Sequence, residues 1–114
     1  MSKKSDAARL RFVFAKIDDL QGYLARFPSV EALFQETMAC DAVLMCLLQI
    51  GETIQKVENE TWAAQLPVQG AYVVRNIIAH DYEGVDLSII VKIVSEDIPP
   101  LRATVIQLLS EEAS

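Results

Sequence analysis

The sequence predicts an all-α protein, an up-and-down bundle of four to five helices with short connections. Apolar residues recur at three- and four-residue spacing along most of the chain, and capping residues or prolines stand where this spacing stops and restarts. No segment alternates apolar and polar residues as a half-buried strand would. With 114 residues, 52% of them apolar, the chain is long enough for one core, and we expect a single domain over residues 1–114.

The first helix is predicted to begin after Ser5, whose hydroxyl can cap it, and to end where Pro28 stops it. Its apolar residues keep the spacing of one helix face, which indicates that this face is buried. These residues are Leu10, Val13, Phe14, Ile17, Leu20, Leu24 and Phe27.

A second, long helix is predicted from Ser29, a further capping residue, to about Val57, with Glu31 in the first turn where the helix dipole favours an acid. Its centre, AVLMCLLQI at residues 42–50, is apolar on more than one face. Such a helix must be covered on all sides. We expect a second copy of the chain to cover part of it in a symmetric dimer, and the alternative is that the domain itself surrounds the helix.

Three shorter helices are predicted in the remainder of the chain. Pro67 suits the first turn of a helix that runs from Val68 to about Ala79, and Asp86 can cap the next one. The segment DIPPL, residues 97–101, predicts a break followed by the start of the last helix. The buried residues expected on the last two helices are Ile89, Ile90, Ile93 and Val94, and then Leu101, Val105, Leu108 and Leu109.

The charge of the chain excludes broad, sequence-independent contact with nucleic acid. The formal net charge is −6, the pI is about 4.6, and no basic run is longer than Lys3-Lys4. A nucleic acid would therefore have to bind at a local basic patch. Cys40 and Cys46 match no zinc or redox spacing, and we interpret them as packing thiols in a reducing cytoplasm.

The sequence predicts neither a membrane segment nor an export signal. The N-terminal residues are polar and charged, and the longest unbroken apolar run covers only residues 42–48. A membrane-spanning helix needs roughly 18 apolar residues or more. We therefore expect a soluble, cytoplasmic protein.

The stretch RNIIAHDYEGVD contains His80, the single histidine of the chain, together with Arg75 and Tyr82. On one unbroken helix Arg75 and Tyr82 would lie within about 20° of each other, whereas Arg75 and His80 would lie about 140° apart. Either the helix ends near Ala79 and His80 turns back, or the two groups meet their equivalents from a second chain. Both alternatives place His80 at an edge or an interface.

Arginine and histidine are suited to cleaving RNA without a metal ion. This reaction needs a base for the 2′-hydroxyl, an acid for the departing 5′-oxygen and a cation for the charge on phosphorus. Histidine can act as base or acid near neutral pH, and guanidinium binds phosphate oxygens in pairs. One chain offers only one histidine, whereas two chains offer two. The residues alone favour a non-catalytic interpretation, with an ion-paired Arg75 at a helix end, a capping or partly buried His80 and a packing Tyr82.

The spacing Arg75-Asn76-x-x-x-His80-x-Tyr82 resembles the Arg-x-x-x-x-His-x-Tyr motif of the HEPN superfamily. The sequence that flanks this motif resembles the HepT-like branch of the superfamily, the toxin half of the HepT and MNT toxin–antitoxin pairs. The similar segments are LLQIGETIQKV, the LP dipeptide before the motif, and EGVDLSIIVKIVSEDIPPL after it. The resemblance covers residues 5 to 110 or so as one HEPN-like domain.

The resemblance implies an α-helical homodimer whose paired motifs form a metal-independent endoribonuclease. Arg75 would hold the scissile phosphate, His80 would transfer the proton, and Asn76 would support the site. The products would carry a 2′,3′-cyclic phosphate, and no metal or other cofactor is expected. The alternatives are a non-catalytic helical module that binds a nucleotidyltransferase, a role also known among HEPN proteins, and a purely structural dimer.

The resemblance also implies a partner. Tyr82 would be the residue to which an MNT-type nucleotidyltransferase antitoxin adds AMP from ATP, and this would silence the nuclease. The 20° offset would place its hydroxyl beside the phosphate site, where an attached AMP would bring bulk and a competing phosphate.

The sequence departs from the family pattern at three positions. Val68 and Glu83 stand where many members carry an aromatic residue, and Val73 stands where a small residue is common. Glu83 would oppose an RNA backbone unless it turns toward solvent. Glu52 matches a recurring acid of the family, and an ion pair with a basic residue of the motif region is the role we expect for it.

Overall fold

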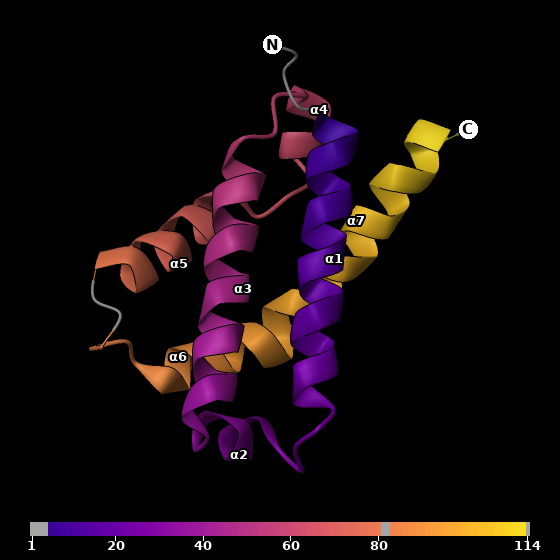
Figure 1. Cartoon of the computed structure of the whole chain (residues 1–114). Helices are drawn as coiled ribbons and strands as arrows, with labels where there is room; N and C mark the ends of the chain where they lie inside the picture. The colour runs from indigo at the N-terminus through magenta and orange to yellow at the C-terminus, as the bar shows by residue number, and fades with distance from the viewer. Residues whose placement is uncertain (1–4, 81–82, 114) are drawn as a thin grey trace.

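The structure is a computed structural model that describes residues 5–80 and 83–113, and these residues contain helices and no strand. The predicted all-α class is confirmed. The elements are drawn in Figure 1, and in chain order they are α1 (Asp6–Leu24), α2 (Val30–Phe34), α3 (Thr37–Gln55), α4 (Glu60–Ala63), α5 (Val68–His80), α6 (Leu87–Lys92), the π-helical turn η1 (Ile93–Asp97) and α7 (Ile98–Ala113).

Helix α1 begins at the predicted cap, since the Ser5 hydroxyl accepts a hydrogen bond from the N–H of Ala8 at 3.1 Å. It ends at Leu24, three residues before the expected end at Phe27. There the backbone changes to the tighter bonding of a 3₁₀ turn, in which the N–H of Phe27 donates to the carbonyl of Leu24 at 3.1 Å. This turn leads into Pro28.

The prediction of one long helix from Ser29 to Val57 is wrong, because two helices, α2 and α3, occupy this segment. Ser29 caps α2 as expected, but Glu36 has extended backbone angles (φ −102°, ψ 117°). The Glu36 carboxylate accepts from the N–H groups of Met38 and Ala39 at 3.4 and 2.7 Å. Glu36 thereby satisfies donors that a helix start leaves unpaired. The apolar spacing continues across this break, so periodicity alone could not reveal it.

The segment between α3 and α5 contains α4, a short helix that the sequence did not predict. Asn59 caps it by accepting from the N–H of Trp62 at 3.0 Å. Helix α5 then starts directly after Pro67, whose carbonyl accepts from the N–H of Ala71 at 2.8 Å. The predicted third helix is confirmed to within one residue at each end.

The predicted break at residues 97–101 is wrong, because α6, η1 and α7 follow one another without interruption. The N–H of Ile98 donates to the carbonyl of Ile93, five residues earlier, and this spacing defines a π turn. Pro99 and Pro100 lie in the first turn of α7, directly after the π turn, and Ile98 before them keeps helical backbone angles (φ −67°, ψ −45°). Their missing donors therefore do not force the chain out of a helix.

The burial of α6 and η1 follows the prediction except at one residue. Ile90 and Val94 are buried and Ile93 is half-buried, whereas Ile89 is 43% exposed. Asp86 caps α6 as predicted, since its carboxylate accepts from the N–H of Ser88 at 3.0 Å.

Helix α3 is the centre of the fold. It lies between α1 and α5, and α7 crosses behind α1, as Figure 1 shows. The helices share one apolar core. Its buried members are Leu10, Val13, Ile17, Leu20, Leu33, Val43, Leu44, Cys46, Leu47, Ile50, Ile54, Leu66, Ile78, Ile90, Val94, Ile98, Leu101, Val105 and Leu108.

The domain itself covers much of α3, since within residues 42–50 only Met45 is exposed, at 46%. By length and composition alone α3 would be long and apolar enough to cross a membrane, a property that core helices also have. Cys46 is buried and Cys40 half-buried, both are free thiols, and burial raises the pKa of each. This agrees with their interpretation as packing thiols.

Asp6 joins the start of α1 to the loop after α3. Its carboxylate accepts from the N–H groups of Glu58 and Asn59, the shortest of these bonds being 2.7 Å, and from Arg9 Nη1 at 2.7 Å. Burial by itself would raise the pKa of the Asp6 carboxyl, but the two backbone donors and the Arg9 guanidinium outweigh it and lower the pKa. Arg9, whose side chain is only 9% exposed, has its charge compensated by Asp6 at 2.7 Å and by Glu58 at 3.9 Å.

We therefore expect Asp6→Ala to lower the free energy of unfolding at neutral pH by about 1–3 kcal/mol, because it leaves three donors without their acceptor. Since the folded state lowers the pKa of Asp6, its contribution is full above the unfolded-state pKa and is lost as the pH falls through the folded-state value. Urea unfolding at neutral pH and at about pH 3 measures both effects. The control, Asp18→Ala, removes a 63% exposed carboxylate and should cost less than about 1 kcal/mol. Equal losses for the two variants would contradict the anchoring role.

Candidate functional site

Arg75 lies on α5 and faces α3. Its Nε is 3.6 Å from Oε1 of Glu52, and the two side chains are 37% and 43% exposed. The expected ion pair between Glu52 and a basic residue of the motif region is therefore present. An ion pair this exposed contributes little to stability, typically less than about 1 kcal/mol. Its main effect is to restrict where the guanidinium points.

Asn76 holds the same guanidinium on another side. Its amide oxygen accepts from Nη1 of Arg75 at 2.9 Å. The Nη2 group has no bond within residues 5–80 and 83–113. A guanidinium presents paired donors that match two oxygens of a phosphate. Arg75 is thus an oriented cation that retains donors for an anionic ligand.

Gly51 determines how closely α5 can approach α3 beside this pair. A Cβ atom at position 51 would lie 2.9 Å from the carbonyl oxygen of Ala71 and 3.1 Å from Cβ of Arg75. Any larger residue would push α5, and Arg75 with it, away from Glu52. Reasoning from the sequence did not identify Gly51 as a site residue. The available signal was a glycine inside a strongly periodic helix, which often marks a close helix contact.

His80 is the last residue of α5 and is exposed. The helix is continuous from Arg75 to His80, so the two side chains leave it about 140° apart. The helix thus ends within one residue of the expected Ala79, but His80 is its last residue and does not turn back toward Arg75. Within one chain the structure brings Arg75 together with Glu52 and Asn76, and it does not bring His80 to them.

Tyr82, the predicted modification site, lies outside the described residues, as does Asp81. The 20° offset between Arg75 and Tyr82 thus stays a prediction. Glu83, where the description resumes, is exposed. An RNA backbone can bind near Glu83 only if this carboxylate turns toward solvent, and the exposure of Glu83 meets this condition.

A polar cavity of about 410 Å³ lies between α1 and α3 on the other side of Glu52. Its lining includes Lys56, which is exposed, and Arg9, which already binds Asp6. The complete lining is Arg9, Phe12, Gln49, Glu52, Thr53 and Lys56. Sequence reasoning missed this cavity, because its residues come from two helices far apart in the chain. Lys56 shares this cavity with Glu52, and Arg75 pairs with Glu52 from α5.

Large apolar side chains are exposed on the same two helices. Met45 of α3 is 46% exposed, and Tyr72 and Val73 of α5 are each 49% exposed. Exposed apolar side chains of this size are common at contacts between proteins. They lie on the helices that carry Glu52 and Arg75.

A family model described as Ribonuclease HepT-like matches residues 14–108 of the chain. The matched span contains Glu52, Arg75, Asn76 and His80, and it covers α3 and α5 in full. No match was found among curated proteins or among solved structures.

The contact at Gly51 can be tested with two matched substitutions. We expect Gly51→Ala to lower the free energy of unfolding by about 1–3 kcal/mol, because the new methyl group meets the Ala71 carbonyl. Gly22→Ala on α1 is the control, since a Cβ there has no atom within 4 Å. It should raise stability by about 0.5 kcal/mol through helix propensity. Thermal unfolding followed by circular dichroism measures both, and equal stability of the two variants would refute the close-contact account.

Proposed function

Since the chain belongs to the HepT-like ribonuclease family, we propose that it is a metal-independent endoribonuclease toxin whose active site is a cleft shared by two chains. Arg75 and His80 of each chain are the proposed catalytic residues, and Asn76 supports Arg75. We further propose that an MNT-type nucleotidyltransferase antitoxin is the partner and that the pair acts in the cytoplasm.

One observation supports an active site that is shared by two chains. Arg75 and His80 lie on a single continuous helix about 140° apart, so they do not converge on one phosphate within a chain. A symmetric dimer can bring His80 of one chain to Arg75 of the other. The exposed apolar side chains Met45, Tyr72 and Val73 on α3 and α5 provide surface for such a contact.

The chemistry then needs no metal ion. One neutral His80 takes the proton from the 2′-hydroxyl, and the 2′-oxygen attacks the phosphorus. The bond from phosphorus to the 5′-oxygen breaks, and the partner's His80, protonated beforehand, gives its proton to that oxygen. The products are a 2′,3′-cyclic phosphate and a 5′-hydroxyl. Arg75 stabilises the extra negative charge on the phosphate oxygens, with its guanidinium oriented by Glu52 and Asn76.

The overall charge of −6 limits where RNA can bind. An RNA backbone is attracted only where cations dominate the local field. The candidate cations are Arg75, which pairs with Glu52 from α5, and Lys56, the residue after α3, which lines a cavity with Glu52. A dimer would hold two copies of each. Recognition of a short RNA stretch at these cations is therefore more consistent with the charge distribution than broad binding.

The first test is growth arrest and RNA cleavage. Expression of the chain should arrest growth, and the purified protein should cut RNA in the presence of a metal chelator. Arg75→Ala and His80→Ala should each lower cleavage by about 100-fold or more. The control is Arg102→Ala, because Arg102 has a similar exposure, 35%, and a similar carboxylate partner, Asp18 at 3.4 Å. If the folded wild-type protein neither arrests growth nor cuts RNA, the nuclease proposal fails.

The shared cleft has its own test in a mixed dimer. A dimer of one wild-type and one His80→Ala chain, isolated with two affinity tags, retains only one of the two histidines. If base and acid come from the two chains, its cleavage rate should fall well below half of the wild-type rate. Independent sites in each chain would leave about half of the activity, an outcome that excludes the composite cleft. Light scattering should first show a dimer at micromolar concentration.

The proposed modification can be measured by intact mass. After incubation with a cognate nucleotidyltransferase and ATP, the wild-type protein should gain the mass of AMP and lose its ribonuclease activity. Tyr82→Phe should gain none and stay active, because the acceptor hydroxyl is absent. Tyr72→Phe is the control, since Tyr72 is a tyrosine of α5 that is 49% exposed. AMP addition to Tyr82→Phe would show that another residue is modified.

A further inference from the structure

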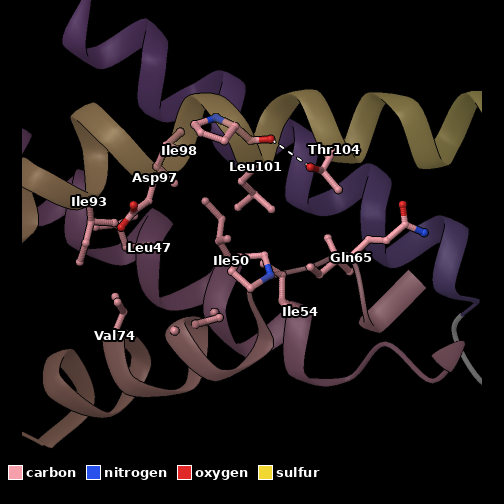
Figure 2. A pocket seen from close by; sticks show the side chains of 16 residues that line it. Leu47, Ile50, Ile54, Gln65, Val74, Ile93, Asp97, Ile98, Leu101 and Thr104 are labelled. Atoms are coloured by element: carbon pink, nitrogen blue, oxygen red, sulfur yellow. Dashed lines mark hydrogen bonds between the residues drawn. The ribbon is translucent and has the colours of Figure 1, made fainter. Parts of the chain in front are cut away.

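A second cavity, of about 450 Å³, lies among α3, α5, η1 and α7, and Figure 2 shows it from close by. Its inner wall is apolar, since Leu47, Ile50, Ile54, Ile98 and Leu101 are each at most 6% exposed. This volume is in the range of cavities that bind small organic molecules. None of the proposed catalytic residues lines it.

The cavity opens to solvent along one rim. Gly70 of α5 and Asp97 of η1 line it and are both exposed. A Cβ atom at Gly70 would have no atom within 4 Å, so the space beside this residue is empty. A ligand could therefore reach the apolar wall without any movement of the helices.

Two of the polar side chains around the cavity are already engaged. The hydroxyl of Thr104 donates to the carbonyl of Pro100 at 3.1 Å, the bond marked in Figure 2. The amide nitrogen of Gln65 donates to the carbonyl of Thr61 at 3.1 Å. The side-chain carboxylate of Asp97 has neither a hydrogen bond nor an ion pair with any of the described residues. Its carboxylate is thus the charged group that the cavity offers to a ligand.

The backbone that presents Asp97 is unusual. Ile93 and Asp97, the first and last residues of the π turn η1, both line the cavity. Single π turns are rare, and they occur frequently at functional sites. Here the turn places an acidic side chain at the end of an apolar wall (Figure 2).

We propose that this cavity is a binding site for a small organic cation, a molecule with an apolar body and one ammonium group. The apolar body would fill the space against Ile50, Ile54 and Leu101, and the ammonium group would pair with Asp97 at the rim. The net charge of −6 adds a general attraction for cations. This binding site is independent of the proposed nuclease activity.

Two probes of matched shape test the proposal, 1-naphthylmethylamine and its neutral counterpart 1-naphthylmethanol. Titration of the purified full-length chain, followed by methyl NMR of the leucine and isoleucine residues, locates the site and measures Kd without RNA. We expect the amine to shift signals of the cavity wall and to bind about two- to fivefold more tightly than the alcohol, the size of effect expected for an exposed ion pair.

Three variants separate charge from shape. Asp97→Asn should remove the preference for the amine. Glu96 is an exposed carboxylate of the same turn that does not line the cavity, so Glu96→Gln should preserve the preference. Gly70→Leu should weaken both probes by filling the opening, and leucine favours a helix over glycine, so the fold is retained. The proposal is overturned if neither probe shifts cavity signals at millimolar concentration. It is equally overturned if the alcohol binds as well as the amine, or if Asp97→Asn leaves the preference intact.

Discussion

The close packing of α5 on α3 at Gly51 is the contact on which the proposed site depends. The missing side chain lets the Ala71 carbonyl and the Arg75 Cβ approach α3. At this separation Nε of Arg75 lies 3.6 Å from Oε1 of Glu52 on α3. The ion pair is too exposed to hold the helices together by itself. The packing at Gly51 sets the distance between α3 and α5, and at this distance Glu52 and Arg75 form their ion pair.

The two cavities beside α3 differ in polarity. One side of α3 faces a polar space that Glu52 shares with residues of α1, and the other helps to form an apolar cavity with α5, η1 and α7. One helix can line both cavities because its successive side chains point in different directions around the helix axis. Glu52 is therefore a polar residue of a mainly apolar helix that lines the polar cavity and pairs with Arg75.

Local signals predicted the helices well wherever a single residue decides their ends. Ser5, Ser29 and Asp86 cap their helices because each side chain bonds to a backbone N–H two or three residues ahead. The break at Glu36 was missed because the apolar spacing continues across it. The π turn at Ile93–Asp97 was missed because adjacent prolines usually indicate a break between helices. Prolines in a first helical turn are nevertheless compatible with a continuous helix.

For the candidate site, the sequence by itself determined the residue types and their order, since Arg75, Asn76 and His80 carry the chemistry and resemble a family motif. It also determined that the two groups would lie about 140° apart if the helix were continuous. Only the tertiary structure decided that the helix does continue to His80, that Glu52 is the partner of Arg75, and that Gly51 sets their distance. The reason is physical: helix periodicity is a property of neighbours in sequence, whereas the contact between α3 and α5 at Gly51 and Glu52 joins residues 20 to 24 positions apart.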